Sequence, residues 1–231
     1  MNKVELIRRM REQLTNVMAQ RQLAKHQAST LAARMALKRY QSARLARTHA
    51  DLLANNNTHA AAEFFLEELY GARDLTQRDA DIERIIPTLE RLLSYHTLDT
   101  IANAITLDAL SENMDAVMAD QLGENFSEND YIEAFRDLTT CIDRERQIGM
   151  VQALGTSLCS LVRIPFLATT LVVMRGPARM AKLGHLQAFL EQGFTTFKAM
   201  KQPQAFVQTI VDRELQISRN IYAGQPNPFQ W

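Results

Sequence analysis

The first 54 residues contain no glycine and no proline, and apolar side chains recur in them at three- and four-residue intervals. The pattern is clearest at Ile7, Met10, Leu14 and Val17. This spacing places the apolar side chains along one face of an α-helix. We therefore predict one long helix over residues 3–54, ended by the three asparagines at 55–57, whose helix propensity is low.

The apolar face of this predicted helix is interrupted by polar residues. Arg21, Lys38, Ser42 and His49 stand where a seven-residue repeat requires an apolar side chain. So many polar seam residues would destabilise a long two-stranded coiled coil. We expect the segment to pack against other helices over part of its length instead.

The composition indicates that the rest of the chain is helical too. Glycine (8) and proline (6) are scarce among 231 residues, good helix formers are abundant, and no β-branched run alternates with polar residues. We predict an all-α protein in which a long N-terminal helix precedes a compact multi-helix bundle. The predicted division is a long basic amphipathic helix over residues 1–56, a bundle over 57–223 and an irregular tail over 224–231.

Local signals predict the helix boundaries in the first half of the bundle. A short helix over residues 58–69 should end at Tyr70-Gly71, with Gly71 as a left-handed cap. Thr76 should open the next helix in a capping box with Asp79. Pro87 should kink or split that helix.

Similar signals predict the later boundaries. We expect one helix over residues 94–121 and another from Glu128 to about Ile164, capped by Ser127. The pair Gly176-Pro177 should end one helix and begin the next.

Residues 151–174 contain a single charge, Arg163. The stretch is long enough to cross a membrane, but Arg163 and Pro165 both oppose that interpretation. We predict a buried central helix pair in which Arg163 pairs with a carboxylate from the acidic middle of the chain. The alternative is that Arg163 binds a carboxylate or phosphate of a ligand.

The net charge of the chain is zero, but the chain divides into a basic, an acidic and a second basic segment. Residues 1–50 hold 11 Lys and Arg against 2 Asp and Glu, residues 51–140 hold 5 against 19, and residues 141–231 hold 10 against 5. We expect the basic helix to dock on acidic helices, within the chain or in a dimer. The alternatives are another protein bound through residues 1–54, nucleic acid, or a membrane surface. Against nucleic acid, the segment has one aromatic residue, Tyr40, and no nucleic-acid-binding motif. Against a membrane surface, its alanine-rich face lacks the Trp and Phe side chains that anchor such helices.

No sequence motif predicts a reaction. The chain has no phosphate-binding loop, no nucleophile elbow and no zinc signature. His59 and Glu63 have the spacing of metal ligands on a helix, but no Glu-x-x-His pair supports them, so we expect no metal and no cofactor. Basic residues near expected helix ends could hold an anion. The candidate ligand-binding residues are Arg78, Asp79, Arg84, Arg163, Arg175, Arg179 and His185.

Two dense blocks carry a family resemblance. The first is EFFLEELYGARDLTQRDADIER at residues 63–84, and the second is MRGPARMAKLGHLQAFLEQGFTTFKAM at 174–200. Together they resemble a family of uncharacterised proteobacterial all-helical proteins with FFLxxLYGxxDxxxRDxDxxR and LQxFLExGF blocks. The resemblance implies no assigned activity and transfers no catalytic residue.

The blocks also have a physical interpretation. The alternating charges from Arg73 to Arg84 could form a salt-bridge network that fixes the turn against the following helices, with Tyr70 as a buried hydroxyl and Leu69 as a core anchor. The alternative is a ligand pocket between the blocks, lined by Arg78, Asp79, Arg84 and His185.

From these observations we expect a non-enzymatic, self-associating interaction protein, most simply a dimer. The first residues lack a secretory signal, and Cys141 and Cys159 are too far apart on one helix to pair, so we expect a cytoplasmic protein. The alternatives are a helical-bundle ligand-binding protein or enzyme with an anion pocket, and a nucleic-acid-binding protein that uses its basic helix.

Overall fold

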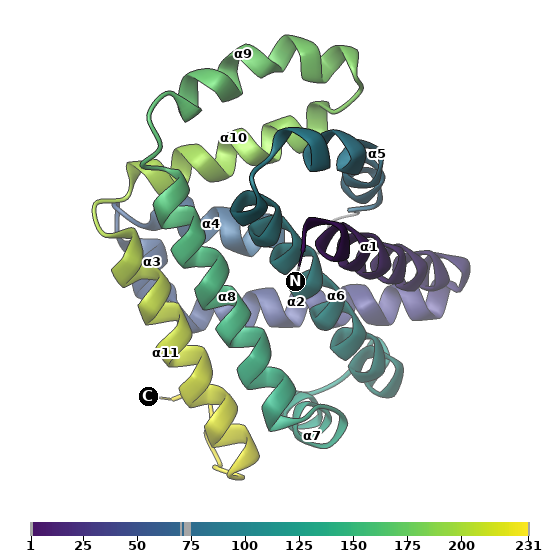
Figure 1. Cartoon of the computed structure of the whole chain (residues 1–231). Helices are drawn as coiled ribbons and strands as arrows, with labels where there is room; N and C mark the ends of the chain where they lie inside the picture. The colour runs from purple at the N-terminus through teal and green to yellow at the C-terminus, as the bar shows by residue number, and fades with distance from the viewer. Residues whose placement is uncertain (1, 70, 72–74, 231) are drawn as a thin grey trace.

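A computed structural model describes residues 2–69, 71 and 75–230, and every regular element within these ranges is helical (Figure 1). The predicted all-α class, with a long first helix and a compact bundle, is confirmed. The helices are α1 (Lys3–His26), α2 (Ala28–Thr48), α3 (Ala50–Ala54), α4 (His59–Phe64), the π-helical turn η1 (Phe65–Leu69), α5 (Thr76–Leu92), α6 (Tyr95–Leu122), α7 (Glu128–Leu138), α8 (Cys141–Leu161), α9 (Leu167–Met180), α10 (Gly184–Ala199) and α11 (Pro203–Tyr222).

The prediction of one helix over residues 3–54 is wrong, because the segment forms α1, α2 and α3. The backbone of Gln27 is extended and separates α1 from α2, and the chain turns again at His49. A straight helix of this length would extend about 78 Å and could not keep its apolar face on one core. The two turns allow α1 and α2 each to pack against α6, and α3 to reach α4.

The central helix α6 contributes to two apolar clusters along its length. Near its start, Leu98 packs with Leu6 and Met10 of α1. Further along, Met118 packs with Leu37 of α2 and with residues of α7 and α11. The N-terminal helices therefore belong to the core of the molecule. The division of the chain at residue 56 stays a prediction.

A third cluster joins α8, α10 and α11 to α3 and α4. α8 and α11 approach so closely that a Cβ atom at Gly155 would lie 2.7 Å from both methyl carbons of Val207. Beside this contact, the rings of Phe197 and Phe206 meet edge to face with centroids 6.4 Å apart. A larger residue at position 155 would require the Val207 side chain or α11 to shift.

The helix predicted from Glu128 to about Ile164 is two helices. α7 ends at Leu138, and the Thr140 hydroxyl caps α8 by accepting a hydrogen bond from the Asp143 N–H at 3.1 Å. The predicted cap at Ser127 is confirmed, since its hydroxyl accepts from the Asp130 N–H. A threonine cap inside an apparently continuous pattern explains the error.

Two prolines lie inside helices rather than at their boundaries. Pro87 does not split α5, and Gly176-Pro177 lies within α9, which continues to Met180. All three residues are exposed, so water can bind the carbonyl that each proline leaves without its helical donor. The turn to α10 instead occurs at Lys182, whose φ is 58°.

The predicted capping box at Thr76 does not form. Leu75 is the N-cap of α5, the Thr76 hydroxyl accepts a hydrogen bond from Lys25 Nζ at 2.7 Å, and Asp79 binds Arg21 instead. At Gly71 a Cβ atom would lie 2.1 Å from the Glu67 carbonyl oxygen. The predicted roles of Tyr70, Arg73 and Asp74, the side chain of Leu69 and the cap conformation after Tyr70 lie outside the described residues.

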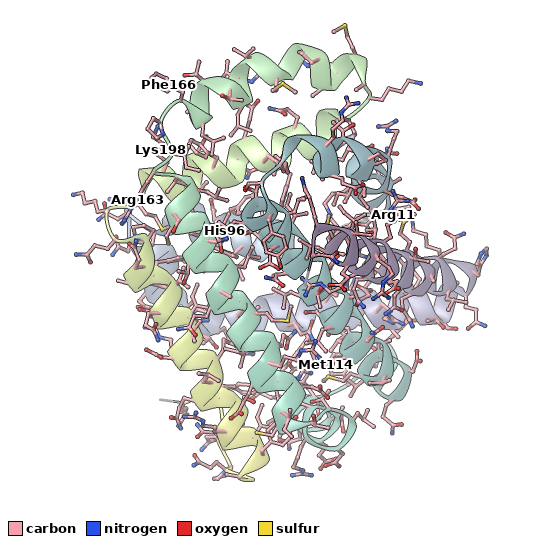
Figure 2. The ribbon with its side chains drawn as sticks, in the orientation of Figure 1. Arg11, His96, Met114, Arg163, Phe166 and Lys198 are labelled. Carbon is pink, nitrogen blue, oxygen red and sulfur yellow. The ribbon has the colours of Figure 1, made fainter. Side chains whose placement is uncertain are left out.

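The prediction of a buried central helix pair over residues 151–174 is also wrong. α8 is partly buried, but α9 lies at the edge of the molecule, and among the described helices its extensive contacts are with α10 alone (Figure 1). Arg163 is exposed at the end of α8 rather than buried with a carboxylate (Figure 2). None of the described helices combines the length and the apolar character needed to cross a bilayer.

The C-terminal tail after α11 has no regular structure, as predicted, but it packs on the bundle. The carbonyl of Pro228 accepts a hydrogen bond from Asn220 Nδ2 at 3.1 Å, and the Phe229 ring contacts that of Tyr131. The tail therefore closes one side of the cluster that α2, α7 and α11 form.

Candidate functional site

The basic N-terminal helices meet the acidic middle of the chain inside the molecule. The guanidinium of Arg21 on α1 forms ion pairs with Asp79 on α5 and with Asp108 and Glu112 on α6, the last two at 2.9 and 3.3 Å. Burial opposes the charge of Arg21, but the three carboxylates outweigh it and raise the pKa of Arg21 above its usual value.

Glu112 is the shared acceptor of this buried charge cluster. Its carboxylate accepts from Lys38 at 2.9 Å and from Arg34 at 3.4 Å, in addition to Arg21. Arg34 and Glu112 are buried, and Lys38 is mostly so. Three cations from α1 and α2 therefore find their counter-charge within the chain, and a nucleic acid or separate protein partner would have to compete for them.

A second buried ion pair joins α2 to α11. Arg44 Nη1 lies 2.6 Å from Glu214 Oε1, and His49 Nε2 lies 3.1 Å from the same oxygen. Burial alone would raise the pKa of Glu214. The charge of Arg44 and the hydrogen bonds from Arg44 and His49 outweigh burial and lower the pKa of Glu214 to about 2.

The sequence contains a signal for both clusters. Arg21, Lys38 and His49 are three of the four polar residues that interrupt the apolar face of the predicted long helix, and Ser42 is the fourth. Each of the first three faces the interior and binds a carboxylate from α6 or α11. Polar seam positions therefore marked buried ion pairs, although the seam pattern alone could not name the partners.

Two predicted site residues belong to the buried charge cluster. Arg78 Nη2 lies 3.2 Å from Asp79 Oδ1 and 2.9 Å from Asp108 Oδ2, and its guanidinium lies 6.0 Å from the ring centroid of Phe189. Asp79 is almost completely buried. The described part of the charged block at residues 75–84 thus forms the predicted salt-bridge network.

Three other predicted residues gather at the turn between α9 and α10. Arg179 and His185 line an open groove of about 590 Å³ together with Lys182, Gly184 and Gln77 of α5. Arg84 adjoins this groove because its Nη2 atom donates to the carbonyl of Lys182 at 3.0 Å. Lys182, Gly184 and Gln77, which are not among the predicted ligand-binding residues, complete the lining.

The remaining two predicted residues do not join the groove. Arg175 forms an ion pair with Glu191 at 2.6 Å, and this hydrogen bond lowers the pKa of Glu191 to about 2. Arg163 lies between α8 and α9, at the opposite end of the α9–α10 hairpin from Gly184 (Figures 1 and 2). The structure therefore does not bring Arg163 close to His185.

The most unusual surface of the molecule is the side of α9 that faces away from α10. Phe166, Val173 and Met180 are 81%, 67% and 82% exposed. They share this side with other uncharged residues, and we call the set the α9 outer face. Its members are Phe166, Thr169, Thr170, Val173, Gly176, Pro177 and Met180. Exposed apolar side chains gathered on one helix face make this face a candidate interaction site.

The described residues offer no group of three or more His, Cys, Asp and Glu side chains that could hold a metal ion. The predicted pair His59 and Glu63 is present, with Nε2 and Oε1 3.3 Å apart, but no third ligand joins it. Both cysteines are free thiols, Cys141 partly exposed and Cys159 buried.

Comparison with known protein families assigns the chain to one family. Residues 20–228 match the family model described as a domain of unknown function, DUF8198. The chain belongs to this family. No curated protein and no solved structure gives a significant match. Membership in DUF8198 agrees with the resemblance to an uncharacterised family and assigns no activity to the groove or to the α9 outer face.

Proposed function

We propose that this protein is a non-enzymatic interaction module that associates with further copies of itself, head to tail, through the α9 outer face. The observation that supports the proposal is that this face is apolar and uncharged, yet no described helix covers it. Burying one large apolar side chain contributes about 1.5–3 kcal/mol, so several on one helix can drive association. α9 is also the helix that the sequence pattern predicts to be buried.

The charges around the α9 outer face determine which kind of surface can bind to it. The chain has no acidic residue from Arg146 to Leu190, and Arg163 and Arg179 flank the α9 outer face. Two α9 helices paired antiparallel about a twofold axis would bring Arg163 of one copy near Arg179 of the other. Like charges placed together oppose binding. The α9 outer face therefore favours an acidic surface with an apolar centre.

The chain carries such a surface at α7 and the first turn of α8, which we call the acidic end. Residues 120–145 hold 8 Asp and Glu against 2 Arg. Ile142 is 78% exposed and Leu138 39% exposed, among the acidic residues Asp137 and Glu145. α7 and α9 lie at opposite ends of the molecule (Figure 1). A contact between two different surfaces leaves one of each free, so it builds rings or filaments.

Sedimentation velocity over a concentration series tests the proposal. We expect the wild-type protein to form species larger than a monomer as its concentration rises, and salt to weaken them. Val173→Asp should remain a monomer. The matched control is Val4→Asp, which changes a 71% exposed valine on α1 and should associate like the wild type. A wild-type protein that stays monomeric at every concentration would contradict the proposal.

A further inference from the structure

We propose that the groove at the turn between α9 and α10 binds the phosphate group of a small ligand. The groove has a volume of about 590 Å³ and is open to solvent. Because the groove is open, a ligand would reach it directly from solvent. The groove adjoins the α9 outer face and shares Arg179 with its border, while Gln77, Lys182, Gly184 and His185 lie outside that face.

The groove gathers positive charge that the chain does not neutralise. Arg179 and Lys182 are exposed, and neither makes an ion pair with another described residue. Arg175, one helical turn before Arg179, shows the contrast because Glu191 pairs with it. Two cations and His185 around one concave surface attract a multiply charged oxyanion more strongly than a single carboxylate.

The backbone around the groove is held in place before any ligand binds. Lys182 adopts a left-handed conformation that few residues other than glycine adopt. Its carbonyl accepts a hydrogen bond from Arg84 at 3.0 Å, and the N–H of Leu183 donates to the Ala178 carbonyl at 2.8 Å. A ligand therefore binds to a turn that is already ordered, which lowers the entropic cost of binding.

Two carboxylates lie close to this region, and each already pairs with another arginine. Glu191 pairs with Arg175 and also attracts Arg179, and the second carboxylate is Asp81. Asp81 Oδ1 accepts hydrogen bonds from Gln77 at 2.9 Å and from Arg84 at 3.1 Å. Arg84 therefore offsets Asp81, and the charge of Arg179 and Lys182 remains for a ligand. Because α10 begins at Gly184, its positive dipole end adds to the attraction.

Isothermal titration calorimetry on the full chain tests the site with pyrophosphate, inorganic phosphate, AMP and acetate. We expect pyrophosphate to bind with a Kd of about 1 mM or lower, and acetate not to bind. Tighter binding of AMP than of inorganic phosphate would identify a phosphate ester as the ligand class, and equal binding would identify free phosphate. Absence of pyrophosphate binding, or equal binding of acetate, would overturn the proposal.

Variants locate the binding and separate it from self-association. The double variant Arg179→Gln/Lys182→Gln should weaken pyrophosphate binding at least about tenfold. Lys198→Gln is the matched control, because Lys198 is an exposed lysine near the other end of α10, against Phe194 (Figure 2). Equal weakening in the control would contradict the site. Val173→Asp should bind pyrophosphate like the wild type. A missing groove site would therefore appear as lost pyrophosphate binding, and a missing self-association would appear only in sedimentation.

Discussion

The Nη2 atom of Arg21 lies 3.3 Å from Oε2 of Glu112, and this ion pair links α1 to α6 across 91 residues of sequence. Arg21, Arg34 and Lys38, three of the eleven Lys and Arg in residues 1–50, all bind Glu112. The contrast between a basic first segment and an acidic second segment is resolved inside one chain, in a buried cluster that fixes α1 and α2 against α6.

Glu112→Gln tests how much this cluster contributes to the stability of the protein. The substitution keeps the shape of the side chain but leaves Arg21, Arg34 and Lys38 without their shared negative charge. We expect a loss of about 3–5 kcal/mol in the free energy of unfolding, measured by urea denaturation. Glu83→Gln, on the exposed side of α5, should change it by less than about 0.5 kcal/mol. Equal losses in the two variants would contradict a structural role for the cluster.

Gly155→Ala tests the contact between α8 and α11. The added methyl would lie 2.7 Å from two carbons of Val207, so we expect a loss of about 1–3 kcal/mol in stability. Gly149→Ala on the same helix meets no atom within 4 Å and should stabilise the protein by about 0.5–1 kcal/mol. Thermal and urea unfolding measure both changes. If Gly155→Ala proved as stable as Gly149→Ala, the close packing described for α8 and α11 would be wrong.

Glu214→Gln tests the ion pair between α2 and α11 through its pH dependence. The pKa of Glu214 is lowered to about 2 in the folded protein, from 4.5 in the absence of its partners. A carboxylate with a lowered pKa stabilises the folded state above its unfolded pKa, and this stabilisation is lost as the pH falls through the folded pKa. The contribution at neutral pH is roughly 3 kcal/mol.

Urea unfolding at several pH values measures this contribution. The stability difference between the wild type and Glu214→Gln should be largest above about pH 5 and should shrink as the pH approaches 2. A difference that stays constant across this range would show that Glu214 acts through packing rather than through its charge.

Phe166→Asn separates folding from association. Phe166 has a φ of 62° and is 81% exposed, so it strains the backbone and buries little apolar surface within one copy. Asparagine tolerates this conformation better, and we expect an unchanged or slightly raised Tm. Loss of the exposed ring should weaken self-association about tenfold or more. An unchanged association in analytical ultracentrifugation would remove Phe166 from the docking surface.

The sequence was a good guide to the helical class and a weaker guide to helix ends. The cap at Ser127 is a local signal, and the prediction of it is confirmed. The turns at Gln27 and at Thr139-Thr140 depend on which neighbours the flanking helices pack against, and periodicity within one segment does not contain that information. Arg21 and Lys38, polar residues within the apolar face of the predicted helix, were the sequence signal for tertiary contacts, because both form ion pairs with Glu112.

The error at α9 has a different cause. An apolar segment predicts burial, but it does not state whether the covering surface belongs to the same chain. Arg163 was expected beside a carboxylate, and the structure places it at the surface next to an apolar face. Positions where local sequence rules and the folded chain disagree are often functional. At α9 the disagreement supports an interface completed by another molecule.

A mixing experiment tests the head-to-tail account most directly. Val173→Asp blocks the α9 outer face, and Ile142→Lys blocks the acidic end. In sedimentation velocity each variant alone should be a monomer. An equimolar mixture should form a species of twice the monomer mass and nothing larger, because each copy keeps one intact surface. A mixture that stays monomeric, or an Ile142→Lys variant that associates like the wild type, would contradict the account.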